Sequence, residues 1–176
     1  MKKLLLLATL AFGFGFSSLA QDGTEALEQK PSPTDIAKTW VGDSYVKITY
    51  NRPHKRNRVV FGELVPYGEV WRTGANAATE ITTTEDITLG GKELEAGTYS
   101  IFTIPNEDSW TIIINSDLGQ WGAYRYKEEN DVLRFDVATQ EAPTTYEAFT
   151  IAFEGEDNSK MLVMMWDDVK IAISIK

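Results

Sequence analysis

An arginine in a segment rich in glycine and aromatic residues is well placed to recognise a charged group. Arg72 follows Trp71 and precedes Thr73-Gly74, and Asn76 lies two residues further on. A guanidinium can donate paired hydrogen bonds to a carboxylate or phosphate, so Arg72 either binds an anionic group of a ligand or locks a buried carboxylate. We predict that Trp71, Arg72 and Asn76 contribute to a ligand-binding site.

A second candidate segment runs from Asp117 to Tyr124 and contains Trp121 between two glycines. An exposed indole face can stack on a sugar ring, but the same side chain can equally close the end of a β-sandwich. We predict ligand-binding roles for Trp121 and Tyr124, in a pocket shared with the Arg72 segment.

His54 is the only histidine, so any imidazole-based acid–base chemistry must use it. It lies within a basic cluster that extends from Arg52 to Arg58. This cluster is either a solvated loop or a site for an anionic group. We include His54 among the predicted ligand-binding residues.

The sequence supplies no recognisable catalytic set. The chain has no cysteine, one histidine and no G-x-S-x-G motif, which excludes thiol catalysis, disulfides and a multi-histidine zinc site. Among 26 acidic residues, Glu80 is the least arbitrary carboxylate for a hydrolase, although a salt-bridge or surface role is the simpler interpretation. The acidic hairpin at 154–158 lacks the calcium-binding loop pattern. We expect no metal and no cofactor, and we assign no catalytic residue.

The N-terminal segment predicts export. Lys2 and Lys3 precede an apolar run over residues 4–16, and Ala20 ends a small-residue cleavage motif. Residues 1–20 are therefore predicted to be a secretory signal peptide, and residues 21–35 a flexible tether. We expect a soluble periplasmic or secreted protein without a membrane span, and without cysteine it can carry no thioether lipid anchor.

The charge of the chain argues against nucleic acid as a partner. The sequence has 17 basic and 26 acidic side chains and a formal charge of −9. Counterion release from nucleic acid needs a broad basic surface, and the only basic cluster is local.

Apolar residues alternate with polar ones in most of the remaining chain, as in half-buried strands. The alternation is clearest at 46–50 and 169–175. Further runs are expected at about 58–62, 69–72, 80–89, 98–104, 109–115, 132–138, 145–154 and 160–166, with short helical turns at 35–41 or 127–131. We predict an all-β domain over residues 36–176, a two-sheet antiparallel β-sandwich, with a closed barrel as the alternative. Tyr99, just after Gly97, resembles the tyrosine corner of sandwich domains.

Several motifs in a fixed order resemble one family. They are Phe61-Gly62 through Pro66-Tyr67-Gly68, Trp71 to Asn76, Ala96 to Ser100, and Leu118 to Gly122. Together they resemble the exported bacterial family catalogued as domain of unknown function 2911, over about residues 30 to 176. The resemblance implies export, a single β-rich domain and an ancestry in the Gram-negative envelope. It implies no activity, substrate or catalytic residue.

Three functions follow from these residues. The first is a binding module that holds a small polar or carbohydrate-like ligand, with Arg72 and Asn76 orienting it and Trp121 stacking on it. The second is an envelope hydrolase that uses Glu80 with Arg72 or His54. The third is a structural or protein-interaction domain in which the motifs only pack the fold. We favour binding, because aromatic, amide and guanidinium groups suit recognition of a polar ligand.

Overall fold

The computed structural model describes residues 31–156 and 159–176. The predicted signal peptide and residues 21–30 of the predicted tether lie outside the described residues. The strands are β1 (Thr34–Val41), β2 (Ser44–Asn51), β3 (Thr79–Thr83), β4 (Ile87–Leu89), β5 (Lys92–Leu94), β6 (Gly97–Pro105), β7 (Ser109–Asn115), β8 (Asp131–Glu154) and β9 (Met161–Ser174), and a 3-10 turn, η1, spans Glu128–Asn130.

Alternating burial explains why these segments form strands. In β2, Val46, Ile48 and Tyr50 are buried and the residues between them are half-buried. Near the C-terminus, Ile171 and Ile173 are buried in the same way. A strand places successive side chains on opposite faces, so this pattern turns one face of each strand toward the core. The predicted alternation in both regions is confirmed.

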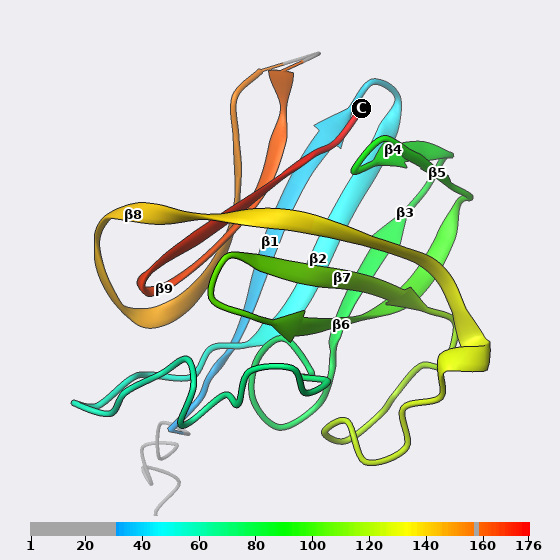
Figure 1. Ribbon diagram of the computed structural model, residues 1–176. Coiled ribbons are helices and arrows are strands. Elements are labelled where there is room, and N and C mark those ends of the chain that lie inside the picture. The colour runs from blue at the N-terminus through cyan, green and yellow to red at the C-terminus, as the bar shows by residue number, and fades with distance from the viewer. Residues whose placement is uncertain (1–30, 157–158) are drawn as a thin grey trace, which may run out of the picture.

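One curled antiparallel sheet makes up most of the molecule. Its strand order is β1-β2-β3-β6-β7-β8-β9, and β4 and β5 form a separate small sheet. In Figure 1, β8 turns sharply between its yellow first half and its orange second half, and the red part of β9 then passes across β1. Register shifts in the β8–β9 ladder near Tyr146 mark this bend. Such irregularities locally bend a strand and increase its twist.

The predicted all-β sandwich is confirmed, and its two layers are continuous through β8. Isolated backbone bridges outside the main strand pairs add further connections. His54, just after β2, bridges to Ala148 of β8, and Leu89 of β4 bridges to Ile175. These bridges cover part of the exposed sheet edges, which would otherwise present unpaired backbone groups.

Some predicted element boundaries differ from those observed. Residues 132–138 and 145–154 were predicted as two strands but belong to the single strand β8. Residues 160–166 and 169–175 likewise join in β9, where Asp167 has a positive φ of 56° and pairs with Tyr146 between two register shifts of the β8–β9 ladder. The predicted run 80–89 divides into β3 and β4, whereas 58–62 and 69–72 contribute only isolated bridges.

The predicted helical turns have different outcomes. The turn at 127–131 is confirmed as η1, but the prediction for 35–41 is wrong, because that segment is β1. Its residues pair in register with β2 from Thr34 onward, so cross-strand hydrogen bonding stabilises the extended backbone. The strand therefore begins two residues before the predicted domain start at residue 36.

The core between the layers is rich in aromatic side chains, and Trp71 lies at its centre. Its indole stacks on that of Trp166, with ring centroids 5.9 Å apart and an interplanar angle of 18°. Edge contacts join it to Trp110 at 5.9 Å and to Phe149 at 5.1 Å. Aromatic pairs at these distances add to the stabilisation from burial alone.

Tyr99 makes the hydrogen bond expected of a tyrosine corner. Its hydroxyl donates to the carbonyl oxygen of Glu95, four residues earlier, at 3.2 Å. A tyrosine corner is defined by this return to the upstream backbone.

No helix within residues 31–156 and 159–176 has the length and apolar character needed to cross a membrane.

Candidate functional site

The segment from Trp71 to Asn76 is fixed against the sheet at its first residue. The backbone N–H of Trp71 donates to the carbonyl of Thr103 in β6 at 2.7 Å, and the reverse bond measures 2.9 Å. The indole N–H of Trp71 then donates to the carbonyl of Gly74 at 3.0 Å. The chain between these points therefore forms a closed loop above the aromatic core.

The backbone of this loop is strained at a buried residue. Thr73 has a positive φ of 55° and is fully buried. β-Branched residues rarely adopt this conformation, and such strain is concentrated at functional sites. Thr73 is held by two hydrogen bonds, from its hydroxyl to that of Thr103 at 3.1 Å and to its carbonyl from the Thr79 hydroxyl at 2.6 Å.

Gly74 further restricts the backbone conformation of the loop. Its φ is +154°, and a Cβ at this position would lie 2.8 Å from the carbonyl oxygen of Asn51. No side chain larger than hydrogen fits there without movement of the backbone. The loop thus presents Arg72 and Asn76 in one fixed arrangement.

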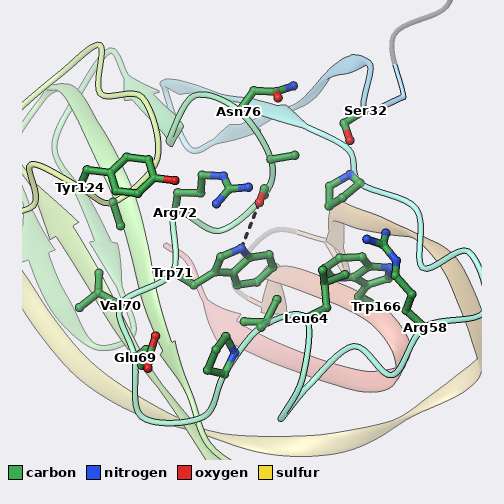
Figure 2. Close-up of a pocket in the computed structure, with 16 residues that line it drawn as sticks. Ser32, Arg58, Leu64, Glu69, Val70, Trp71, Arg72, Asn76, Tyr124 and Trp166 are labelled. Carbon is green, nitrogen blue, oxygen red and sulfur yellow. Dashed lines mark hydrogen bonds between the residues drawn. The ribbon is translucent and has the colours of Figure 1, made fainter.

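Arg72 opens onto a cavity of about 560 Å³. Figure 2 shows Arg72 between Trp71 and Tyr124, with Asn76 above it and Arg58 on the opposite side of the pocket. The lining also includes Trp166 and Glu69. A volume of this size lies within the range of small-molecule binding pockets. We call this cavity the Arg72 pocket.

Within the described part of the chain, the guanidinium of Arg72 has no hydrogen-bond or salt-bridge partner. Its Nε is buried without a hydrogen-bond partner, and no salt bridge reaches Arg72 from the described residues. Burial lowers the pKa of Arg72 from its ordinary value, and the nearby Tyr124 partly opposes this shift. Leaving a charged donor without a partner in a half-buried position is unfavourable, which makes the group available to an anion.

Arg58 approaches the Arg72 pocket with its orientation already fixed. Its Nη2 donates to the carbonyl of His54 at 2.7 Å and its Nε to that of Lys55 at 2.9 Å. The pocket therefore has two guanidinium groups and, among its described lining residues, one carboxylate, Glu69. This excess of positive charge favours an anionic guest.

The predicted site residues divide into two groups. Trp71, Arg72, Asn76 and Tyr124 all line the Arg72 pocket. His54 does not line it; its backbone bridges to Ala148 of β8.

Trp121 lies on a neighbouring hollow that it shares with Tyr124. The predicted common pocket is thus divided into two adjacent concavities that meet at Tyr124.

The candidate carboxylate Glu80 does not line the Arg72 pocket either. Its Oε1 accepts a hydrogen bond from the backbone N–H of Gly119 at 2.9 Å. Two backbone bonds strengthen this junction, from Ala78 N–H to the Gln120 carbonyl at 2.8 Å and from Gly122 N–H to the Asn76 carbonyl at 2.9 Å. Glu80 therefore secures the loop at 117–124 to β3, and the Gly122–Asn76 bond secures it to the segment that carries Arg72.

Sequence reasoning missed several lining residues, among them Glu69, Trp166 and Arg58. Glu69 and Trp166 lie in none of the motifs considered above. Arg58 belongs to the basic cluster that was considered as a site for an anionic group. Gln120 was also missed, and it lines the hollow beside Trp121. Its only signal was a polar side chain between two small or aromatic neighbours in a glycine-rich loop.

These observations define an all-β domain with a strained loop that presents an unpaired arginine to a cavity. The chain belongs to the family described as Protein of unknown function (DUF2911), which matches residues 32–175. The resemblance found in the sequence motifs is confirmed. Neither the curated proteins nor the solved structures give a significant match to the chain.

Proposed function

We propose that this protein is an exported binding domain whose Arg72 pocket holds a small polar ligand with an anionic group. The observation that carries the proposal is the buried, unpartnered Nε of Arg72 at the edge of a cavity of about 560 Å³. A carboxylate or phosphate would supply the missing hydrogen bonds and neutralise the guanidinium. Asn76 and Tyr124 add neutral hydrogen-bonding groups on the same wall.

The rigidity of the pocket supports binding. The Arg72 loop is held by the backbone bonds of Trp71 and by the buried hydroxyls around Thr73. A preformed site loses less conformational entropy when a ligand binds. The ligand would then meet side chains that already point into the cavity, as Figure 2 shows for Arg72 and Tyr124.

Export is part of the proposal and rests on the sequence of residues 1–20. A basic start, an apolar run and a small-residue cleavage motif ending at Ala20 support delivery to the periplasm or the medium. The ligand would then be a solute or surface component outside the cytoplasm.

Binding is favoured over hydrolysis by the composition of the lining. Glycoside hydrolysis usually needs two carboxyl groups on opposite sides of the substrate. Glu69 is the one carboxylate among the described residues of the Arg72 pocket, and the lining contains no histidine. Glu80, the carboxylate predicted for the hydrolase alternative, is instead bonded to the backbone of Gly119.

The test uses protein recovered from cells that express the full 176-residue sequence. Thermal shift and calorimetry are measured with inorganic phosphate, citrate, glucuronate and glucose 6-phosphate. We expect at least one probe to raise the Tm of the parent protein. Arg72→Met should abolish that shift and Arg72→Lys should weaken it, whereas Arg56→Met, in the same basic cluster but outside the lining, should leave it unchanged.

The same variants separate a binding role from a packing role. If Arg72 is kept for a ligand, Arg72→Met should keep or raise the Tm of the free protein, because it removes an unpaired buried donor. A Tm lowered by several degrees, together with no shift by any probe, would show that the guanidinium packs the fold. The protein would then be better described as an interaction domain.

A further inference from the structure

A second hollow, of about 580 Å³, lies on the other side of Tyr124 from the Arg72 pocket. It is formed by the loop from Asp117 to Lys127. Its lining includes Leu118, Gln120, Trp121, Tyr124 and Arg125. We call it the Trp121 hollow.

The amide of Gln120 is the most unusual group in this hollow. Gln120 is 8% exposed, yet neither its Nε2 nor its Oε1 has a hydrogen-bond partner among residues 31–156 and 159–176. A buried primary amide offers two donors and one acceptor, and leaving them all unpaired destabilises the fold. A buried polar group without a partner needs an explanation, and a role in binding a polar ligand is one.

The nearby Asn115 shows that the fold can satisfy a buried amide. Asn115 is fully buried, and its Nδ2 donates to the carbonyl of Lys127 and to the carboxylate of Asp131, each at 2.9 Å. Its Oδ1 accepts from the backbone N–H of Asp117 at 2.9 Å. Gln120, in the same loop, takes no part in this network.

Exposed apolar side chains line the same hollow as Gln120. Trp121 is 67% exposed, and Leu118 and Tyr124 are exposed as well. Trp71, Trp110 and Trp166 are all buried, and the remaining tryptophan, Trp40, packs against Tyr45 with ring centroids 5.4 Å apart. Within residues 31–156 and 159–176, no aromatic ring pairs with Trp121. Its indole is therefore left open to solvent or to a ligand.

The Trp121 hollow is built on a fixed loop. Gly119 is bonded to Glu80, the Gln120 carbonyl to Ala78, and the Asp117 carbonyl to the hydroxyl of Ser100 at 2.6 Å. These bonds anchor the loop to β3, β6 and the Arg72 segment. The backbone that carries Gln120 and Trp121 is thus positioned before any ligand arrives.

We propose that the Trp121 hollow is a saccharide-binding site, separate from the Arg72 pocket. A pyranose ring has an apolar C–H face that would stack on the exposed Trp121 indole, and a rim of hydroxyls that would pair with the Gln120 amide once this buried side chain turns toward the hollow. An open aromatic face with a few convergent polar groups suits this ligand. The formal charge of −9 makes a nucleic acid strand a poorer fit to the same stacking face.

The test titrates the full-length expressed protein with cellotetraose, tetra-N-acetylchitotetraose and tetragalacturonate by calorimetry, and with uridine as the alternative stacking ligand. At least one saccharide should bind. Trp121→Ala should abolish that binding, whereas Trp40→Ala, which removes the other exposed tryptophan, should not change it. Binding of uridine alone, or of no saccharide, would overturn the proposal.

Gln120→Met separates a ligand-binding amide from a structural one. The variant should weaken saccharide binding at least tenfold and should keep the Tm of the free protein or raise it by about 2 °C, because an unpaired buried amide is lost. A Tm lowered by several degrees with unchanged saccharide affinity would overturn the proposal.

Arg72→Met distinguishes this site from the Arg72 pocket. It should leave the binding of the neutral saccharides, cellotetraose and tetra-N-acetylchitotetraose, unchanged. If it abolishes saccharide binding while Trp121→Ala does not, the sugar occupies the Arg72 pocket; the present proposal is then wrong and the proposed function still holds.

Discussion

The Glu80 carboxylate accepts a hydrogen bond from the backbone N–H of Gly119 at 2.9 Å and so joins β3 to the loop that carries Trp121. The two residues are 39 positions apart in the chain. Because the Arg72 segment and the Trp121 loop are also bonded through Asn76 and Gly122, this contact belongs to the frame of both candidate sites.

Removing the Glu80 carboxylate should loosen the Trp121 loop. Glu80→Ala is expected to lower the free energy of unfolding by about 1 kcal/mol, since a hydrogen bond to a charged group is lost at a partly exposed position. Hydrogen exchange should show weaker protection of the Gly119 amide. Glu93→Ala, an exposed glutamate of β5, is the control and should change neither quantity.

Gly74→Ala should destabilise the protein because the added Cβ meets the carbonyl oxygen of Asn51 at 2.8 Å. The expected loss is about 2–4 kcal/mol from steric overlap and the left-handed backbone. Gly91→Ala is a matched control, since Gly91 also has a positive φ but nothing lies within 4 Å of its Cβ. It should cost about 1 kcal/mol. Equal losses in urea denaturation would refute the packing argument.

Tyr99→Phe tests the tyrosine corner. It removes the hydroxyl that donates to Glu95 and should lower the free energy of unfolding by about 1 kcal/mol. Tyr45→Phe, in β2, should have little effect, because no hydrogen bond of its hydroxyl is found in the described part of the chain. If Tyr99→Phe leaves stability unchanged, the corner makes no net contribution.

Alkaline conditions should weaken the fold through Tyr50. Burial raises its pKa above the ordinary value of 10.0, and the negative charge of Asp35 adds to the shift. Above pH 10 the unfolded chain loses the proton while folded Tyr50 keeps it, so stability is full below pH 10 and falls as the pH rises through the folded pKa. Tyr50 alone should contribute up to about 1 kcal/mol per pH unit.

Urea denaturation at pH 8 and pH 10.5 measures this effect. Tyr50→Phe should reduce the difference in the free energy of unfolding between the two pH values. At pH 8 the same variant should be less stable than the parent, because the Tyr50 hydroxyl also accepts a hydrogen bond from the Ile151 N–H at 3.1 Å across the two layers. An unchanged pH dependence would contradict the assignment to Tyr50.

The sequence predicted individual strands better than the way in which the strands continue and connect. The alternation of apolar and polar residues identified β2 and the end of β9, because a strand that is buried on one face carries apolar side chains at every second position. It did not show that β8 continues through both layers. The bend near Tyr146 keeps the backbone extended, and only tertiary packing determines that the apparent gap in the pattern is a bulge and not a turn.

The sequence also predicted only part of the candidate site, because contacts between residues distant in the chain determine the rest. Residue type and spacing pointed to Arg72, Asn76 and Tyr124, which do share a cavity. Sequence could not show that Trp121 faces a separate hollow, nor that the Gln120 amide is buried without a partner. Whether a polar side chain is satisfied depends on atoms distant in the chain, as the pairing of Glu80 with Gly119 illustrates.

The strand order of the large sheet has a consequence for assembly of the fold. Apart from the inserted β4–β5 hairpin, each strand pairs with the one that precedes it in the chain. A chain that emerges N-terminus first, from a ribosome or a translocation pore, could add strands one at a time to a growing edge. Lys176 would join the fold late in this process, because Lys176 and Thr88 exchange backbone hydrogen bonds of 2.9 and 2.7 Å. Until they emerge, β4 lacks its final partner, and the nascent domain would remain open at that end.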